Sequence, residues 1–384
     1  MKVEMTKDTG LVFITGGSAL NKLARMLADN RLFATYIVAV FDNGGSTALL
    51  RQYCGIAIGD IRNRLVAIAE HDSPESKVLA DLFSLRIHGN KPQRLMRAAV
   101  EDIASGRSES LADLPQDVRD EISKALMTLL AGLPETFDWR DGAIGNFILV
   151  GRYLQDKDWE ATLKWAHRIV GACGLVLPTT IESAHLGAHL KNGSYIVGQN
   201  RLTDESRPIR SPIERILLLP SDTAFAKTKQ VSIYPPARNQ LEKASAIVYS
   251  WGSFYTSVLS GFLVGGLPET ILASGSPKVL LLNPLKDAET LGKTPVDLVE
   301  DLARYARSRA GDTTGKIITH VLALRSTSPS PSQFYSVEYR APIERLGVNV
   351  IEVECDETPN LEQLETIMRH LLELAHWDLK NEVK

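Results

Sequence analysis

The sequence of 384 residues has few cysteines, and they form no pattern. Cys54, Cys173 and Cys355 lie far apart and are odd in number. A small secreted scaffold held by disulfides needs more cysteines in pairs, and a structural zinc site needs closely spaced ligands. The sequence therefore argues against both classes. It favours a reducing compartment, in which we expect Cys54 and Cys173 to be buried, inert thiols.

Long apolar runs and an excess of one charge are also missing. No run approaches the roughly 20 apolar residues that span a bilayer, and the first ten residues lack the apolar core of a signal peptide. The 43 Lys and Arg residues nearly balance the 46 Asp and Glu residues, for a net charge of -3. Nucleic-acid binders usually carry a clear basic surface. We expect a cytoplasmic protein that binds neither a membrane nor a nucleic acid.

The beginning and the last third of the chain show a strand–helix rhythm. Leu11–Thr15 and Thr35–Phe41 are continuous apolar runs, and apolar residues between Leu20 and Leu27 recur three and four apart. Strands that are apolar on both faces are typical of a parallel sheet covered by helices. Further strands are predicted at 246–249, 278–282, 317–324 and 348–353. The sequence therefore predicts an α/β fold with a mostly parallel sheet.

The segment from about 88 to 135 differs from the rest. Strand patterns disappear there, and apolar residues recur at helical spacing in a charged background, as in Val118, Ile122, Leu126 and Leu129. We predict a helical insertion at about 88–135.

Glycine-rich segments follow the first two predicted strands, as Thr15–Asn21 (TGGSALN) and Asp42–Ser46 (DNGGS). Open parallel sheets bind ligands at the carboxyl ends of their strands. Glycines let the backbone approach a phosphate closely, and the first N–H groups of a helix attract anions. Asp42 suits a hard metal cation or a hydroxyl. The ordinary alternatives are a tight strand-to-helix turn and an Asn-Gly hairpin turn.

Two further polar segments follow the same rule. In Gly59–Asn63 (GDIRN), Asp60 would be a natural N-cap, while Arg62 offers a charge-assisted donor to a phosphate. Tyr249–Ser257 (YSWGSFYTS) is a second strand–glycine–helix corner, with Tyr255 available to stack on a base or sugar. Each segment alone has a structural explanation. Four of them at strand ends favour one shared site for a phosphorylated, nucleotide-type ligand.

Other chemistry finds little support in the sequence. His185 and His189 are four residues apart, but no glutamate follows the first, as a metalloprotease helix requires. The Gly-x-Ser-x-Gly motif of serine hydrolases is absent. We therefore assign the two histidines ordinary surface or packing roles.

Together these segments resemble the 2-phospho-L-lactate transferase (CofD-like) family. The motifs that carry the resemblance occur in the family's order between about Leu11 and Asn283: GGSALN, DNGGST, GDIRNRL, IGNF and GSFYTS. The superfamily also contains the YvcK-like gluconeogenesis factors, and the sequence is most similar to a CofD-related branch of the kind found in GAK gene systems. The resemblance implies a three-layer Rossmann-like fold, a single domain over residues 1–384 and a homodimer.

The resemblance also implies a chemistry and a set of residues. In the transferases, a guanosine-diphosphate-linked donor passes a phospho-acyl group to a deazaflavin hydroxyl, with magnesium and release of GMP. In the YvcK-like branch the same cleft binds uridine-diphosphate sugars. Here Asp42 and Asp60 would be the catalytic carboxylates and would bind Mg²⁺ or the acceptor hydroxyl. The residues expected to bind the nucleotide or its phosphates are Gly16, Gly17, Ser18, Asn43, Gly44, Gly45, Ser46, Arg62, Asn63, Asn146, Gly252, Ser253, Tyr255, Thr256 and Asn283.

Two hypotheses of function follow. The leading one is a magnesium-dependent transferase that moves a phospho-acyl group from a nucleotide-diphosphate-linked donor to an acceptor hydroxyl. The alternative is a non-catalytic regulator that binds a nucleotide sugar. The pair of Asp42 and Asp60 favours the enzyme, whereas Asn43, at a position where the family commonly has a second acidic residue, favours the regulator.

Overall fold

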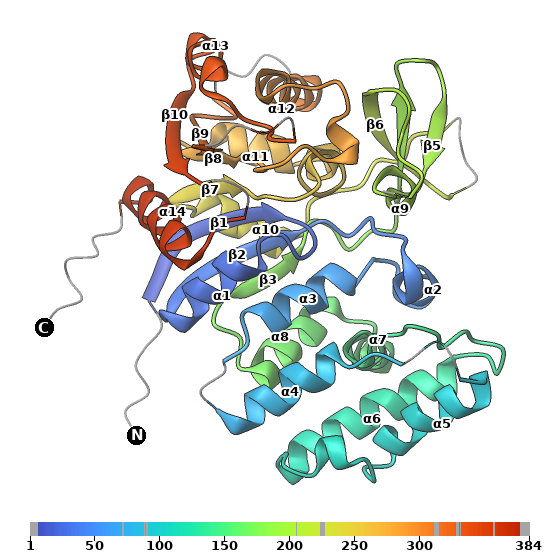
Figure 1. Cartoon of the computed structure of the whole chain (residues 1–384). Coiled ribbons are helices and arrows are strands. Elements are labelled where there is room, and N and C mark those ends of the chain that lie inside the picture. The colour runs from blue at the N-terminus through green and yellow to red at the C-terminus, as the bar shows by residue number, and fades with distance from the viewer. Residues whose placement is uncertain are drawn as a thin grey trace, which may run out of the picture.

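The centre of the protein is a seven-stranded parallel sheet with the strand order β10-β9-β8-β7-β1-β2-β3 (Figure 1). The computed structural model describes residues 7–70, 73–87, 89, 91–204, 206–222, 227–310, 315–327, 330, 332–355 and 358–376. The strands of the sheet are β1 Lys7–Thr15, β2 Leu32–Val38, β3 Leu175–Pro178, β7 Ala246–Tyr249, β8 Lys278–Leu281, β9 His320–Arg325 and β10 Asn349–Glu354.

Helices cover both faces of this sheet, so that its central strands are buried. Helices α1 (Asn21–Asp29), α3 (Gly59–Ala67) and α14 (Leu361–Leu374) pack on one face; α10 (Pro235–Glu242), α11 (Leu267–Ala273) and α12 (Pro295–Ala310) lie on the other. Leu11, Val12, Phe13 and Ile14 of β1 are all at most 2% exposed, which explains why both alternating sets of side chains are apolar. The predicted three-layer, Rossmann-like α/β fold is confirmed.

The order of the strands indicates where a ligand crevice is expected. The chain moves from β1 to β2 toward one edge of the sheet and from β7 to β8 toward the other edge. In doubly wound sheets, ligands bind outside the carboxyl ends of the strands at this change of direction. The loops after β1 and β7 are therefore the places to look for a site.

A helical region lies below the sheet in Figure 1. The segment predicted as a helical insertion contains α5 (Gln93–Ala104), a short 3₁₀ turn (Glu109–Leu111) and α6 (Gln116–Gly132); His88 and Asn90 lie outside the described residues. Helix α6 packs against α7 (Ile144–Asp156). The other helices of this region are α2 Gly45–Cys54, α4 Pro74–Ser84 and α8 Trp159–Val170.

A small antiparallel sheet stands beside the large one, with the order β5-β4-β6 (Figure 1). Its strands are β4 His185–Leu190, β5 Tyr195–Val197 and β6 Ile213–Leu219, and the short helix α9 (Gln199–Leu202) follows β5. His185 and His189 thus lie in a strand and not on a helix. In the described part of the chain, no helix has the length and apolar character needed to cross a membrane.

Some predicted boundaries were wrong. Strand β2 ends at Val38 and not at Phe41, because the carbonyl of Val40 accepts a hydrogen bond from the N–H of Ala57 and leaves the sheet. Strand β9 begins at His320 and not at 317. After β7 the chain forms a π-helical turn, η2 (Phe254–Val258), and a 3₁₀ turn, η3 (Leu259–Leu263), before α11 begins. The remaining short elements are η4 Ala288–Thr290, η5 Val337–Tyr339 and α13 Arg340–Arg345.

Candidate functional site

The glycine-rich loop after β1 lies at this change of direction, at the carboxyl end of the strand. A side chain at Gly16 would clash with Ser257 of η2, so the loop and the η2 segment approach each other as closely as glycine allows. Gly16 is buried, Gly17 is half-buried and Ser18 is exposed. Within the described residues, the backbone N–H groups of Gly17 and Ser18 have no hydrogen-bond partner. These donors are therefore free for an anionic ligand.

Arg64 of α3 is hydrogen-bonded to this loop. Its Nη2 donates to the carbonyl of Gly17 at 3.1 Å, and the guanidinium lies over the ring of Tyr36, 5.2 Å from its centre. The side chain is fully buried, and burial lowers the pKa of Arg64 to about 10, so the group stays charged at neutral pH. Arg64 therefore fixes the position of the Gly17 carbonyl and with it the conformation of the loop.

The loop after β2 carries Asp42 into the same region. The Oδ1 atom of Asp42 accepts a hydrogen bond from the N–H of Gly44 at 3.0 Å, which fixes the carboxylate at the start of α2. Asn43 turns away from it, because its Oδ1 accepts from the N–H of Asn200 at 3.1 Å in α9. Asn43 therefore ties the loop to the small sheet.

Asp60 does not cap α3, contrary to one expectation from sequence. The N-cap position belongs to Ile58, and Asp60 sits in the first turn without a capping hydrogen bond. Its carboxylate faces the first loop: a Cβ atom placed on Gly17 would lie 3.5 Å from Oδ1 of Asp60. No hydrogen bond or ion pair to this carboxylate is found in the described part of the chain. Asp60 is thus a largely buried carboxylate without a protein partner.

The charge of Asp42 acts on Asp60. Burial first, and then the charge of Asp42, raise the pKa of Asp60 to about 7, against the opposing effect of Arg64 and Arg62. Burial likewise raises the pKa of Asp42, although hydrogen bonds from Gly44 and Asn43 and the charge of Arg51 oppose this shift. A bound cation would favour the ionised form of both carboxyl groups.

Arg62 extends the polar surface toward α7. It is 5% exposed, and its Nε donates to Oδ1 of Asn146 at 3.3 Å. Asn146 lies in the first turn of α7 and is 2% exposed. The predicted residues Arg62 and Asn146 are therefore partners of each other, while Asn63 is half-buried on the same helix.

The corner after β7 is built differently, because its polar groups already have protein partners. The N–H of Gly252 donates to Oδ1 of Asn283 at 2.9 Å, and Nδ2 of Asn283 donates back to the carbonyl of Gly252 at 2.8 Å. Gly252 has a φ of +112°, which a residue with a side chain rarely adopts. A Cβ there would also approach Ala19 to 3.3 Å. The two hydrogen bonds of Asn283 therefore fix the conformation of this turn.

Glu289 of η4 occupies the N-terminal end of η2. Its Oε2 accepts hydrogen bonds from the N–H groups of Tyr255 and Thr256 at 2.9 and 3.1 Å, and its Oε1 accepts from the hydroxyl of Thr256 at 2.6 Å. Glu289 is 1% exposed, and burial raises its pKa to about 7. The carboxylate thus accepts hydrogen bonds from groups of Tyr255 and Thr256 that were expected to bind a phosphate.

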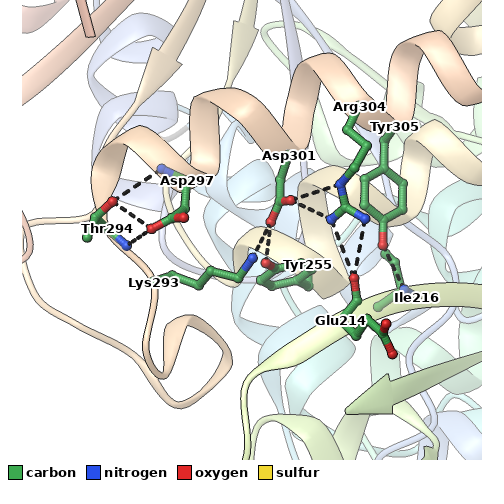
Figure 2. A network of polar contacts seen from close by, with 9 residues as sticks. All are labelled: Glu214, Ile216, Tyr255, Lys293, Thr294, Asp297, Asp301, Arg304 and Tyr305. Carbon is green, nitrogen blue, oxygen red and sulfur yellow. Dashed lines mark hydrogen bonds and ion pairs between the residues drawn. The ribbon is translucent and has the colours of Figure 1, made fainter. Parts of the chain in front are cut away.

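Tyr255 is buried in contacts within the protein, which does not match its predicted role of stacking on a base or sugar. Its side chain is fully buried, and its hydroxyl donates to Oδ2 of Asp301 at 2.5 Å (Figure 2). Lys293 donates to the same oxygen at 2.9 Å, and Arg304 donates to Oδ1. Burial alone would raise the pKa of Asp301, but the hydrogen bonds from Tyr255, Lys293 and Arg304 together hold it below its usual value.

This network also joins α12 to the small sheet. In Figure 2, Arg304 reaches from Asp301 to the carbonyl of Glu214, and the hydroxyl of Tyr305 accepts a hydrogen bond from the N–H of Ile216 at 2.7 Å. Both contacts are made to β6. The network therefore fixes η2, α12 and the small sheet relative to one another.

The predicted residues thus fall into two groups. In the first group, Gly17 and Ser18 have free N–H groups and Asp60 has no partner within the described residues, while Asp42 and Arg62 each make one hydrogen bond to a neighbouring residue. Gly252, Tyr255, Thr256 and Asn283 are held in internal hydrogen bonds. Sequence reasoning missed Arg64, Glu289 and Asp301, although Glu289 follows a strand end and could have been found by the same rule as Asp42.

A magnesium ion fits the residues that are present. Among the described residues, no three His, Cys, Asp or Glu side chains are grouped to hold a metal. Magnesium, however, takes most of its six ligands from water and substrate phosphates and needs only one or two carboxylates. Asp60, unpartnered and beside Asp42, offers that chemistry.

The fold and this site define a Rossmann-like α/β protein with a glycine-rich loop after β1, a carboxylate after β2 and a second carboxylate in the first turn of α3. The sequence model of the 2-phospho-L-lactate transferase CofD family matches residues 11–366, and the chain belongs to that family.

Relatives and solved structures agree with this placement. A gluconeogenesis factor from Halalkalibacterium halodurans is 28% identical, over 76% of this chain and 72% of that protein. A gluconeogenesis factor from Listeria innocua is 25% identical, over 90% and 89%. A crystal structure of a Bacillus halodurans protein aligns with a TM-score of 0.68 at 23% identity, over 95% of this chain and all of that chain. This last similarity concerns the fold.

Proposed function

We propose that the protein is a magnesium-dependent transferase that moves a phospho-acyl group from a nucleotide-diphosphate-linked donor to an acceptor hydroxyl. The observation that carries this proposal is the meeting of Asp42 and Asp60 beside the free N–H groups of Gly17 and Ser18. Carboxylates for a cation and donors for a phosphate are what phosphoryl transfer needs from a protein, because the reaction depends on positioning and charge stabilisation.

Each side chain has a role in this proposal. The N–H groups of Gly17 and Ser18 bind the diphosphate, Gly16 keeps the loop close to η2, and Arg62 with Asn146 forms one wall. Arg64 acts as a positioning residue, since it contacts the loop and not the ligand. The remaining predicted residues of the second loop, Gly44, Gly45 and Ser46, begin α2 beside Asp42, and Ser253 begins η2.

The transfer step can be written with its atoms balanced. The acceptor's hydroxyl oxygen attacks the phosphorus that carries the acyl group, and a new P–O bond forms. The P–O bond to the nucleoside monophosphate breaks, and its electron pair leaves with that monophosphate. The hydroxyl proton passes to the carboxylate of Asp42 or Asp60. A bound magnesium ion would supply positive charge to the phosphate oxygens.

One observation favours the alternative, a nucleotide-sugar-binding regulator without catalysis. The side-chain oxygen of Asn43 accepts a hydrogen bond from the N–H of Asn200. It is therefore not available as a cation ligand in place of the acidic residue that the family commonly has at this position. Relatives at 25–28% identity are named gluconeogenesis factors, and not transferases. The two hypotheses share the nucleotide and differ in the need for magnesium.

A thermal-shift panel tests the proposal. The panel contains GDP, UDP, ADP and their sugar conjugates, each with and without magnesium. We expect at least one diphosphate to raise the melting temperature, and to do so more strongly with magnesium. Failure of every nucleotide under both conditions would reject nucleotide binding, and equal shifts with and without the metal would favour the regulator.

The resemblance also predicts a homodimer. Light scattering tests this directly, because one chain has a mass of 42.2 kDa and a dimer has twice that mass.

A further inference from the structure

A cavity of about 420 Å³ opens beside the second loop, on the side of α2. Its wall is formed by Asn43, by Ala48 and Arg51 of α2, and by Ser183, His185 and Asp222 from the small sheet and its connections. A volume of this size holds a small organic ligand. Of these residues, only Asn43 belongs to the set predicted from the sequence.

Arg51 is the unusual residue in this wall. Its side chain is 5% exposed, and Nη2 donates to the carbonyl of Ala184. Its other donors, Nε and Nη1, have no hydrogen-bond partner. No ion pair joins Arg51 to a carboxylate within the described residues. Buried polar groups are nearly always paired in native proteins, and a buried guanidinium with unpaired donors lowers the stability of the folded state.

Arg51 also lies close to the proposed reaction centre. Its charge acts on Asp42, and Asn43, the neighbour of Asp42, lines the same cavity. A guanidinium presents its N–H groups as a planar fork that matches the two oxygens of a carboxylate or phosphate. Asp222 lies in the same wall and suits a hydroxyl or amine.

We infer that this cavity is a second ligand subsite, in which Arg51 binds a carboxylate or phosphate oxygen of a small molecule and Asp222 accepts from its hydroxyl or amine. The inference rests on the proposed function in one respect, because such a ligand would lie beside Asp42 in the position of the acceptor. Its binding, however, requires neither nucleotide nor magnesium.

The test follows the Arg51 side chain itself. Protein labelled with ¹⁵N-arginine is titrated with inorganic phosphate and, separately, with acetate, and the arginine Nε–H signals are followed by NMR spectroscopy. The signal of Arg51 is identified by its loss in Arg51→Lys. We expect one of the two anions to shift this signal saturably, which also tells a phosphate-bearing ligand from a carboxylate-bearing one.

A second arginine provides a matched control. Arg201 lines a separate surface cavity of about 630 Å³ together with Arg207 and Arg210. Its signal, identified with Arg201→Lys, reports non-specific attraction of anions to arginine. We expect it to shift weakly and without saturation over the range that saturates Arg51.

Calorimetry on the variants completes the experiment. Lysine keeps the charge of Arg51 but not the fork, so Arg51→Lys should bind the effective anion ~10- to 100-fold more weakly, whereas Arg201→Lys should bind it as the wild type does. An Arg51 signal that does not respond, or that follows the curve of Arg201, would overturn the inference. A nucleotide-binding failure in the thermal-shift panel would instead reject the proposed function and leave these titrations unaffected.

Discussion

Two corners of the molecule look alike in sequence and differ in structure. We call them the acidic corner, formed by Gly16–Ser18, Asp42 and Asp60, and the β7 corner, formed by residues 250–258 with Asn283 and Glu289. Both are rich in glycine and polar residues. In the β7 corner the polar groups pair with Glu289 and Asn283. In the acidic corner Asp42 accepts from the N–H of Gly44, but the carboxylate of Asp60 and the N–H groups of Gly17 and Ser18 have no partner within the described residues.

The comparison teaches where a ligand is needed. A buried polar group that has a protein partner stabilises the fold, whereas one without a partner carries a cost that a ligand can remove. Loss of a residue in the β7 corner should therefore lower stability. Loss of a carboxylate in the acidic corner should lower ligand binding and leave stability unchanged or higher.

The largest expected effect concerns Asp301, which holds the β7 corner to α12. Asp301→Asn would leave the buried ammonium of Lys293, 9% exposed, without its countercharge. Removing one partner of a buried ion pair costs ~3–5 kcal/mol. Urea denaturation measures the free energy of unfolding.

Asp297→Asn is the matched control for this prediction, on the same helix. Asp297 accepts from the N–H and hydroxyl of Thr294, and asparagine can still accept there, so the loss should be below about 1 kcal/mol. Equal losses in the two variants would show that the Asp301 network is not a special support.

A loss of comparable size is expected at Glu289. Glu289→Ala leaves the N–H groups of Tyr255 and Thr256 unpaired, at about 1–3 kcal/mol for each buried group that water does not reach. Glu289→Gln keeps one acceptor oxygen and should lose less. The same denaturation experiment compares them. If alanine were tolerated as well as glutamine, the amides would have found other partners.

Gly252 should come next in magnitude. Gly252→Ala forces a side chain into a backbone with a φ of +112°, at a cost of ~1–3 kcal/mol. Gly275→Ala is the control, because a Cβ there meets nothing within 4 Å. A thermal melt in which both variants match the wild type would show that the turn accommodates a side chain at this position.

The smallest effect is a pH dependence from Asp60. The pKa of Asp60 is raised to about 7 in the folded protein, so between pH 4 and 7 the unfolded chain has lost this proton while the folded protein still holds it. The contribution of Asp60 to the free energy of unfolding is therefore favourable at low pH and is lost as the pH rises through 7. Because part of the residue contacts solvent, we expect about 1 kcal/mol.

Urea denaturation at a series of pH values measures the free energy of unfolding. For Asp60→Asn this free energy should change less between pH 4 and 7 than for the wild type, and it should be higher than that of the wild type above pH 7. The exposed Asp81 provides the control, since Asp81→Asn should run parallel to the wild type. A curve for Asp60→Asn that is parallel to the wild type as well would mean that Asp60 is an ordinary, solvated acid.

The sequence predicted the fold well because its strands are buried on both faces. Continuous apolar runs such as Leu11–Thr15 have few other interpretations. The strand-end rule also describes the loops of Gly17 and Asp42, which follow β1 and β2. It was wrong for Asp60, because the segment 59–63 follows helix α2 and begins α3.

What the sequence could not predict depended on partners that are distant along the chain. Tyr255 is 46 residues from Asp301, and Thr256 is 33 residues from Glu289. A tyrosine or threonine after a glycine has the same pattern whether it faces a ligand or a buried carboxylate. Arg51 and Arg64 look like ordinary charges on amphipathic helices until the fold buries them.

The most direct test of the account measures nucleotide affinity with and without magnesium. The best nucleotide of the panel is titrated by calorimetry into the wild type, Asp42→Asn and Asp60→Asn, with Asp297→Asn as a control outside the crevice. We predict that magnesium tightens binding to the wild type and the control about tenfold or more, equal to ~1.4 kcal/mol, and that each crevice variant loses most of this gain. Affinity that is the same with and without magnesium in all four proteins would contradict the account.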